Sequence, residues 1–527
     1  MSTAGASESA SGTASHPRAG CGLNGVEVPS SPRAALGPGM FLIACLTGAI
    51  AISGCKVGPD YARPEPLGTN ATPAGFSGAP ATNETAWKPA EPSAHLPRGA
   101  WWDLFSDPEL QRLEALSMAQ NQQLAGALAR LDEARAAFSL ARADLFPQVS
   151  LNPSYVRQRT SANEPSNGHA AGISPTYNTF LLQLQAGWEV DLWGRIRRQA
   201  ESSQARLTAS EADLETVKLA LQAELATDYF ALRSLDSEYD LLQRTTDAYR
   251  KSLQLTLNRR KGGVASDLDV AQAQTQLETA NATLPAIRLQ RLSLVHAVAT
   301  LCGQPATGFG LPPMTNQAVL PRVPVGVPSE LLERRPDIAT AEQLVAAANA
   351  QIGVAVGAFY PRVTFNGLAG LQSVDASTWF NWPSRFWAFG PSLDLPLFTG
   401  GRNRAQLAFA KAAYRETVAN YRQTVLTAFQ EVEDQLATQT LLKAQVEAQT
   451  AALLAAQHNL EIANNRYRAG LITYLEVAIA QSSALNIERT VVQLQGQKLI
   501  AAVGLVKALG GGWEERPALR AVVDLSK

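Results

Sequence analysis

Two long segments without glycine or proline limit the possible folds of this chain more than any other feature. One lies between Gly194 and Gly262, and the other lies between Gly401 and Gly470. At about 1.5 Å per residue, about 67 residues of unbroken helix extend for about 100 Å, which is too long for an ordinary globule. Such helices need partner helices along their length, as in coiled-coil packing. Apolar residues of the first segment recur at helical spacing: Leu219, Leu221, Leu225, Tyr229 and Leu232.

A short sequence near the end of each long segment occurs twice in the chain. "LNRRKGGVASDLDVAQAQ" begins at Leu257 and "NNRYRAGLITYLEVAIAQ" begins at Asn464, and the two align on Gly263 and Gly470. This similarity indicates an internal repeat. Each copy predicts a helical hairpin whose second helix packs back on the first. These second helices are expected over 264 to about 301 and 471 to about 509.

The repeated turns carry the signals of helix ends. Gly263 and Gly470 fit the left-handed residue that follows the last helical turn. Pro285 is expected to bend the second helix of the first hairpin. Basic residues that suit the negative end of a helix come before the glycines: Arg259, Arg260, Lys261, Arg466 and Arg468. Capping boxes are expected to open the next helices at Ser266 to Asp269 and Thr473 to Glu476.

Strands are expected between the helical segments. In "TFLLQLQAGWEVDLW", which begins at Thr179, apolar and polar residues alternate strictly. This is the pattern of a strand with one apolar and one wet face. "RFWAFGPSLDLPLF", which begins at Arg385, shows the same alternation. Weaker partners precede both, at 148–155 and 363–372, so each half of the chain predicts one β-hairpin.

A soluble sheet with one face on a core is the usual source of such alternation. Strands of about 10 residues rimmed by aromatic side chains also fit a membrane β-barrel. Four strands cannot close a barrel, and an open edge is not tolerated in lipid. A membrane sheet therefore requires oligomerisation, and a trimer would give twelve strands. The aromatic residues at the rims are Phe180, Trp188, Trp193, Phe386, Trp387 and Phe398.

The N-terminal region contains a secretory signal. The run "GMFLIACLTGAIAISGC" has the length and small-residue ending of a signal peptide. Its last four residues resemble the lipobox of bacterial lipoproteins, which predicts a covalent lipid on Cys55. An uncleaved anchor helix is the alternative, and translation starts at Met1 or Met40. Lys56 is not the aspartate that retains such lipoproteins at the inner membrane, so the outer membrane is the expected location.

The expected layout follows from these signals. In order, it comprises a leader and lipoprotein signal peptide at 1–54, an extended arm at 55–100, the first repeat at 101–312, a linker at 313–335, the second repeat at 336–510 and a tail at 511–527. The β-hairpins lie at about 147–193 and about 361–398, and the long helical hairpins at 195–302 and 402–509. The predicted fold class is mainly α, with long coiled-coil helices and four membrane β-strands per protomer.

Several segments in this order resemble one known family. The lipobox followed by "CKVGPDYARP", the segments "WWDLFSDPEL" and "LLERRPDIATAE", and the two repeated turns are similar to those of the TolC-like outer membrane factors. The lipoprotein branch that serves resistance-nodulation-division efflux pumps is the best match. The resemblance implies a homotrimer with a twelve-stranded barrel and a periplasmic α-barrel. It also implies a passive exit duct in outer membrane lipid, with a periplasmic adaptor and an inner-membrane pump as partners.

The resemblance also implies roles for residues of the repeated turns. In the family, inward-facing carboxylates and links between hairpins close the periplasmic end, and Asp269 and Glu476 match those carboxylates. Tyr467 matches a linking tyrosine, and Asp267 is a weaker candidate. Where some relatives have an arginine and a second aspartate, this chain has Ile472 and Ile479, which implies a partly hydrophobic constriction. The turns themselves are candidates for adaptor docking, with Gly263, Gly470, Arg259 and Arg466.

Composition argues against other functions. The formal net charge is −1, which gives no reason to expect a nucleic acid partner. The five histidines are scattered, and no zinc-type cluster, phosphate-binding loop or nucleophile elbow occurs. We therefore expect neither an enzyme nor a metal or cofactor beyond the lipid on Cys55. Two alternatives stay open: the exit duct of a type I protein secretion system, and a structural coiled-coil lipoprotein tether.

Overall fold

The computed structural model divides the chain into two units, Met1–Ser53 and Gly54–Lys527. The residues that the structure describes all belong to the second unit. They are 56–67, 99–161, 176–314, 320–321 and 334–511. The predicted signal peptide, the lipidation residue Cys55, and most of the predicted linker and tail lie outside these ranges.

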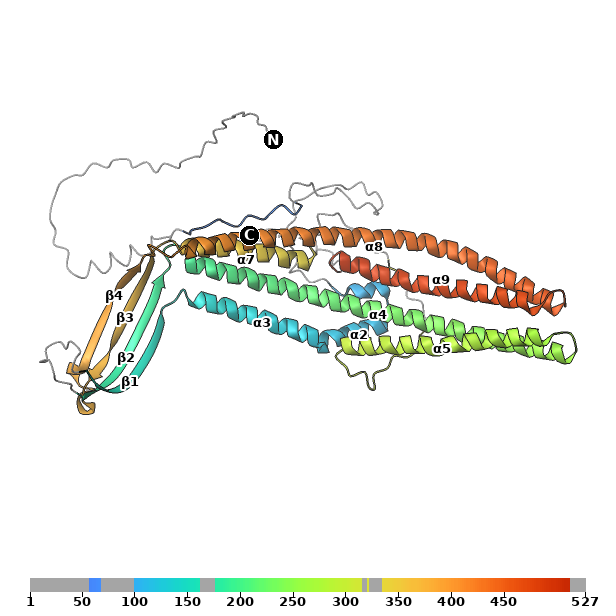
Figure 1. The fold of residues 1–527 in the computed structure, drawn as a ribbon, viewed down its shortest axis with the longest axis horizontal. Helices are drawn as coiled ribbons and strands as arrows, with labels where there is room; N and C mark the ends of the chain where they lie inside the picture. Colours follow the sequence, from blue (N-terminus) through green and yellow to red (C-terminus); the bar gives the residue numbers. More distant parts are fainter. Residues whose placement is uncertain (1–55, 68–98, 162–175, 315–319, 322–333, 512–527) are drawn as a thin grey trace, which may run out of the picture. The chain divides into compact units, whose positions relative to one another are not determined.

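The helices of the two halves match in length. α4 and α8 have 67 residues each, α5 and α9 have 35 each, and α3 and α7 have 22 each. This agreement supports the internal repeat that the sequence predicts (Figure 1). The bounds are α2 Pro108–Gln120, α3 Gln122–Ala143, α4 Arg195–Lys261, α5 Asp267–Leu301, α7 Pro336–Gly357, α8 Arg402–Arg468 and α9 Tyr474–Ala508, with a short 3-10 helix η1 at Trp101–Phe105.

Several predicted helix limits differ from the observed ones. α5 and α9 begin three residues later than expected, because those three residues form the turn. α7 ends at Gly357, and a turn fills the interval before β3. Pro285 lies inside α5, which remains helical on both sides of it. Asp107 caps α2 as its side chain accepts the backbone N–H groups of Glu109 and Leu110.

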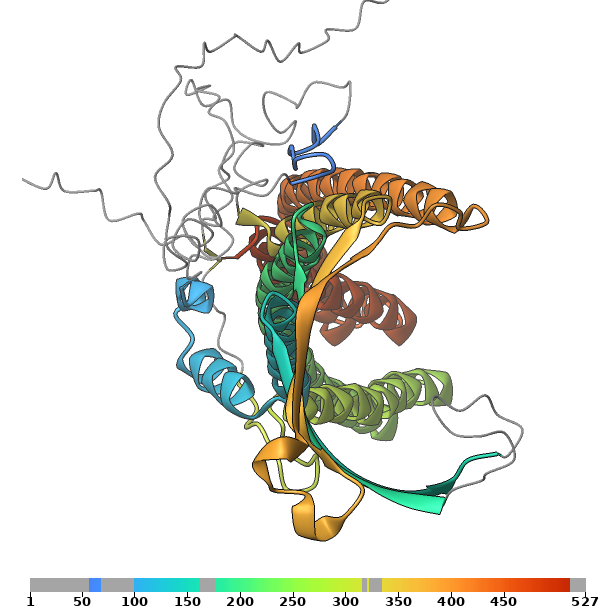
Figure 2. The same cartoon turned by 90° about the vertical axis from the view of Figure 1, so that its left-hand side faces the viewer.

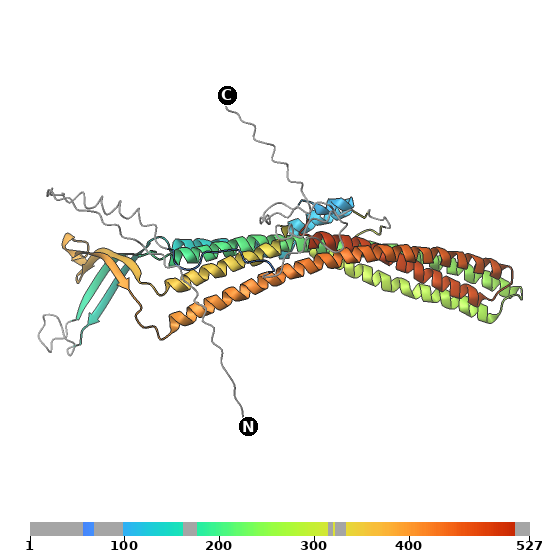
Figure 3. The same ribbon diagram turned by 90° about the horizontal axis from the view of Figure 1, so that it is seen from above.

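α4 is the central helix of the described unit. It contacts α3 and α7 towards its start and α5 and α9 towards its end, while α8 packs on α7 and then on α9 (Figures 1 and 3). The apolar stripe read from the sequence is buried, with Tyr229 and Leu232 fully covered. The largest core cluster joins that stripe to η1, α2, α5 and α9.

The strands form one antiparallel sheet in the order β1-β2-β3-β4, visible as a curved ribbon in Figure 2. Pairing of β2 with β3, as between Leu184 and Ala369, joins the hairpins of the two repeats. β1 continues beyond its predicted end at Tyr155, and β4 stops before the predicted Leu395 and Leu397. The bounds are β1 Gln148–Arg159, β2 Thr176–Val190, β3 Arg362–Ser373 and β4 Arg385–Asp394, with short 3-10 turns at Ala376–Thr378 and Trp382–Ser384.

The register sorts the side chains of the sheet onto two faces. Because successive side chains of a strand alternate, aligned partners share a face. One face is apolar and exposed, with Val149, Leu151, Leu184, Trp188, Phe365, Trp387, Phe389 and Leu393. The other is polar, with Ser150, Asn152, Gln183, Gln185, Glu189, Arg362, Thr364, Asn366, Ser392 and Asp394. Among the described residues, β1 and β4 each pair along one edge only.

The first described residues, Lys56–Leu67, form an arm that is fastened to the helices. Arg198 of α4 is fully buried and donates to the carbonyl oxygens of Val57 at 3.2 Å, Gly58 at 3.3 Å and Pro59 at 2.9 Å. Gly58 has φ +96°, and a Cβ there would lie 2.5 Å from the Cα of Gly353. Lys56–Leu67 form neither helix nor strand, and the arm is bound to the helices rather than loose.

In the described part of the chain, none of the helices combines the length and the hydropathy that a membrane span requires.

Candidate functional site

Both repeated turns end their helices in the same way. Gly263 has φ +74° and Gly470 has φ +79°, which confirms the predicted left-handed position. The N–H of Val264 donates to the carbonyl of Arg259, and the N–H of Leu471 donates to that of Arg466, both at 2.9 Å. These bonds satisfy carbonyl groups that the helix end leaves open. Each turn therefore connects its two helices in a defined geometry.

The helices that follow the two turns are capped differently. Ser266 and Asp269 form the predicted capping box of α5: each side chain accepts from the backbone N–H of the other. The capping box predicted for α9 is wrong, because the Thr473 side chain makes no capping hydrogen bond. The N–H of Tyr474 instead donates at 3.1 Å to a carboxylate oxygen of Asp269. An acid of the first repeat thus caps the helix of the second.

The carboxylate of Asp269 is held in its ionised form. Burial alone would raise its pKa. Four interactions outweigh burial and lower the pKa: hydrogen bonds from the backbone N–H and the hydroxyl of Ser266, a hydrogen bond from the N–H of Tyr474, and the charge of Arg259. Donors to a carboxylate favour the charged form because they bind it more strongly than the neutral acid. The contact between the hairpins is consequently a charge-assisted hydrogen bond at neutral pH.

A second contact between the hairpins lies beside the first. One guanidinium nitrogen of Arg259 donates at 2.9 Å to the carbonyl of Arg468, and the guanidinium lies 4.7 Å from the centre of the Tyr467 ring. The buried hydroxyl of Tyr467 donates to the hydroxyl of Thr256 on α4 at 3.3 Å. The rings of Tyr467 and Tyr474 meet edge to face with centroids 5.5 Å apart. Arg259 and Tyr467 therefore fasten α4 to α8.

The remaining candidate residues lie outside this contact. Asp267 pairs with Arg260 at 2.5 Å across the turn of its own hairpin. Glu476 is exposed, and its carboxylate makes no hydrogen bond or ion pair with the residues that the structure describes. Ile479 is 62% exposed one helical turn further along α9, whereas Ile472 packs partly buried against the tyrosine cluster. Arg466 is exposed.

The tips also expose apolar side chains. Val264, Leu268 and Leu471 are 66–69% exposed, and Leu475 is 49% exposed. Single exposed apolar residues are ordinary on protein surfaces. Here corresponding positions of both turns carry them, since Val264 aligns with Leu471 and Leu268 with Leu475. Each hairpin end therefore presents a similar apolar surface.

Sequence reasoning missed three participants at this site. Thr256 and Ser252 of α4 form hydrogen bonds with the hydroxyls of Tyr467 and Tyr474, at 3.3 Å each, and Tyr474 is fully buried. The only sequence signal was the aromatic residue at the start of α9. Ser252 and Thr256 lie 222 and 211 positions from the tyrosines that they contact, so spacing within either repeat could not reveal these two partners.

Comparison with known proteins is consistent with this architecture. A family model described as "Outer membrane efflux protein" matches residues 115–304 and 327–511. The chain is 34% identical over 476 residues to "Probable efflux pump outer membrane protein TtgC" of Pseudomonas putida, covering 90% of this chain and 96% of that protein. It is 32% identical over 482 residues to "Outer membrane protein OprJ" of Pseudomonas aeruginosa, covering 91% and 97%.

Solved structures show the same fold. The outer-membrane channel OprN matches with a TM-score of 0.76 and 32% identity, covering 87% of this chain and all of that chain. This likeness confirms the predicted fold class of long helices with four strands. The family resemblance inferred from the lipobox, the two helical segments and the repeated turns is also confirmed. The chain belongs to the outer membrane efflux protein family, and it is an outer membrane channel rather than an enzyme.

Proposed function

We propose that the protein is the exit duct of a tripartite efflux system and conducts small organic molecules passively from a periplasmic tunnel to the cell exterior. The observation that carries this proposal is the sheet: one apolar face, one polar face and an unpaired edge at each end within the described residues. An apolar exterior around a polar interior is the arrangement of a water-filled membrane barrel.

The unpaired edges support a homotrimer. Backbone groups at an open edge cannot be left unsatisfied in lipid, so β4 of one protomer must pair with β1 of the next. Three copies of a four-stranded sheet give twelve strands, within the size range of known barrels. The same closure places α8 of one protomer beside α3 and α5 of its neighbour. Long helices then continue the barrel as a tunnel.

The repeated turns form the gate of the tunnel in this proposal. Asp269 and the pair Arg259 and Tyr467 hold the two hairpins of one protomer together. Glu476 and Ile479 lie on an exposed stripe of α9 and constrict the mouth, by charge and by dewetting respectively. Three copies of each turn type surround the axis, so opening requires the hairpins to separate.

The exposed surface of the repeated turns and the names of the relatives support the proposed partners and cargo. The exposed apolar residues of both turns, Val264, Leu268, Leu471 and Leu475, support docking of a periplasmic adaptor that connects to an inner-membrane pump of the resistance-nodulation-division type. Relatives are named for toluene and antibiotic efflux pumps, which supports small organic molecules as cargo. A protein-secretion duct would use the same fold with a different pump.

A lipid on Cys55 completes the proposal. The N–H of Val57 donates at 3.1 Å to the carbonyl of Trp193, between β2 and α4. The Trp193 ring stacks on Tyr360 and donates to the carbonyl of Pro361 at 2.8 Å. Tryptophan and tyrosine favour the interface between membrane and water. The contact of Val57 with Trp193 supports a lipid on Cys55, because acyl chains attached two residues earlier would enter the bilayer beside the barrel.

Conductance of purified trimers in planar bilayers tests the duct and its gate together. We expect small wild-type currents that increase in Asp269→Ala and in Glu476→Ala. Asp267→Ala is the matched control, because its carboxylate pairs within one hairpin and its loss should leave the current unchanged. If neither substitution changed the current, neither acid would contribute to the gate. Absence of both trimers and currents would favour a coiled-coil tether.

A further inference from the structure

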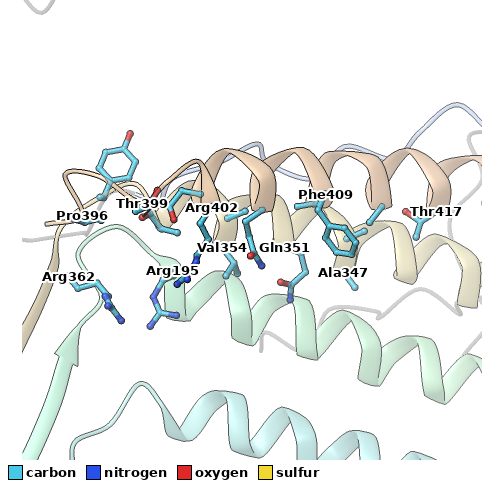
Figure 4. A pocket seen from close by; sticks show the side chains of 18 of the residues that line it. Arg195, Ala347, Gln351, Val354, Arg362, Pro396, Thr399, Arg402, Phe409 and Thr417 are labelled. Carbon is cyan, nitrogen blue, oxygen red and sulfur yellow. Dashed lines mark hydrogen bonds between the residues drawn. The ribbon is translucent and has the colours of Figure 1, made fainter. Parts of the chain in front are cut away.

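A cavity of about 770 Å³ lies where α4, α7 and α8 meet the sheet (Figure 4). Its walls come from the first turns of α4 and α8, from one face of α7 and from the ends of β3 and β4. The arm that follows Cys55 occupies the other face of α7, where Asn349 donates to Pro59. The cavity is therefore separate from the arm and lies far along α4 and α8 from the repeated turns.

The cavity faces the interior of the proposed barrel. Arg362 and Asp394, which line it, belong to the polar face of the sheet together with Glu189 and Gln185. The apolar face, with Trp387 and Phe389, points the other way. A molecule that travels through the duct would pass the mouth of this cavity as it moves from the tunnel into the barrel.

Four arginines line the cavity, and only two of them are neutralised. Arg195 forms a bidentate pair with Glu189 at 2.9 and 3.0 Å, and Arg362 pairs with Asp394 at 2.9 Å. Arg206 and Arg402 are exposed and have no carboxylate partner among the residues that the structure describes. Asp394 is the single acid among the described lining residues. The site therefore carries excess positive charge.

Apolar side chains share the cavity with these guanidinium groups. Phe409 is 74% exposed and Leu344 is 43% exposed, and both line the hollow with Val354. Figure 4 shows Phe409, Val354 and Arg402 bordering the same space. Guanidinium groups bind carboxylates and sulfonates in two-pronged geometry and stack on aromatic rings. A few charged groups on a largely apolar wall are typical of small-molecule sites of this size.

We propose that this cavity is a binding site for amphipathic organic anions in the lumen of the duct. Arg402, at the start of α8, and Arg206, about three helical turns beyond Arg195 on α4, attract the anionic group from two parts of the cavity, and Phe409 with Leu344 and Val354 contacts the apolar part. The inference rests on the proposed function, because a polar face turned inward makes the cavity a place that cargo passes. In the trimer the site recurs three times around the axis and forms a positively charged collar at the base of the barrel.

Fluorescence anisotropy of purified trimers provides the test. The probes are 5-carboxyfluorescein, an aromatic carboxylate, and rhodamine 123, a cation with the same ring skeleton. We expect the wild type to bind the anion in preference to the cation, with an affinity that falls as salt screens the guanidinium groups. Replacing both unpaired arginines, Arg206→Gln with Arg402→Gln, should weaken carboxyfluorescein binding at least about tenfold, or about 1.4 kcal/mol.

Two further variants make the result decisive. Arg404→Gln with Arg415→Gln removes the same charge from exposed positions of α8 outside the cavity and should leave binding unchanged. Arg206→Lys with Arg402→Lys keeps the charge but loses the two-pronged geometry, so its affinity should lie between those of the wild type and the glutamine variant. The inference would be overturned if Arg206→Gln with Arg402→Gln bound carboxyfluorescein as tightly as the wild type. It would also be overturned if Arg404→Gln with Arg415→Gln lost as much affinity as the cavity variant. Anisotropy measures probe binding and does not depend on ionic current. Failure of the proposed duct would therefore appear as absent conductance, and failure of the proposed site as absent binding.

Discussion

A carboxylate oxygen of Asp269 accepts the backbone N–H of Tyr474 at 3.1 Å, and this bond connects the two hairpins through residues that lie 205 positions apart in the sequence. The bond uses the ionised acid, whose pKa is lowered from its ordinary value of 3.8. A lowered pKa means that the stabilising contribution is present above the unfolded value and is lost as pH falls through the folded value.

The closed mouth should therefore resist mild acid. In a Glu476→Gln background, which removes the other acid of the proposed gate, we expect conductance in planar bilayers to stay constant from about pH 7 to about pH 5 and to increase only below 3.8, where Asp269 takes up a proton. Asp269→Asn keeps an oxygen acceptor without a titrating group and should abolish that increase. A rise between pH 5 and 7 in that background would assign control of the mouth to another group.

Ile479 supplies a second prediction about the mouth. Its side chain is 62% exposed on α9, and water avoids a constriction that is lined by apolar groups. Ile479→Asn should increase single-channel conductance about twofold or more by wetting the constriction. Ile462→Asn, at an exposed position of α8 before the turn, is the control and should leave the current unchanged. Equal currents in all three proteins would exclude a hydrophobic gate at this position.

The two turn glycines predict a loss of local stability on substitution. Gly263 has φ +74°, and a Cβ added there would meet no atom within 4 Å, so strain of the left-handed backbone is the whole effect of Gly263→Ala. That strain costs about 1–2 kcal/mol. Hydrogen exchange at the tip of α4 and α5 should speed up accordingly. Gly262→Ala, at φ −81°, is the neighbouring control and should not accelerate exchange.

The arm next to Cys55 gives a steric prediction. A Cβ at Gly58 would meet the Cα of Gly353 at 2.5 Å, so Gly58→Ala should displace the arm and expose the amide of Val57 to hydrogen exchange. Gly308→Ala is the matched control, because Gly308 also has positive φ, +88°, but has open space around it. Unchanged protection of Val57 in Gly58→Ala would show that the arm is not held by this contact.

Glu114 of α2 should make stability depend on pH. It is fully buried, neither carboxylate oxygen has a hydrogen-bond partner in the described structure, and burial raises its pKa from 4.5 to about 9. Between these values the unfolded chain loses the proton that the folded chain keeps, so stability falls as pH rises. Glu114→Gln should raise the melting temperature at pH 8 more than at pH 5.

Glu109, one turn earlier, is the control for that measurement. Its hydrogen bond to Arg112 lowers its pKa, so Glu109 is ionised in both folded and unfolded chains between pH 5 and 8. Glu109→Gln should therefore shift the melting temperature equally at the two pH values. If Glu114→Gln also gave equal shifts, the acid would be ionised in the folded protein.

Local signals in the sequence were sufficient for much of the fold. The absence of glycine and proline defined α4 and α8, because nothing within these stretches interrupts helical hydrogen bonds. Gly263 and Ser266 were readable because a left-handed glycine and a capping box depend on residues within one turn. Strict alternation of apolar and polar residues also located β2 from neighbouring residues alone, because one face of the strand meets water and the other does not.

Contacts between the repeats were not readable in this way. Thr473 has the right spacing to Glu476 for a capping box, yet Asp269 of the other hairpin reaches the N–H of Tyr474 and takes that role. The bond exists because α5 and α9 meet at one particular axial offset, which no local pattern encodes. Arg198 is similar: in the sequence it is one arginine of an amphipathic helix, and only packing shows that it binds the arm.

The two unpaired edges of the sheet also determine how the protein must enter a membrane. A single chain that reached the bilayer alone would bring the bare backbones of β1 and β4 into lipid, at several kcal/mol for each unsatisfied group. A partly inserted sheet is therefore unstable, and three chains must associate before the barrel can span the membrane. The rate of channel formation should consequently rise more steeply than linearly with the concentration of newly secreted chain. Below a threshold supply, folded helices would accumulate in the periplasm without any pore.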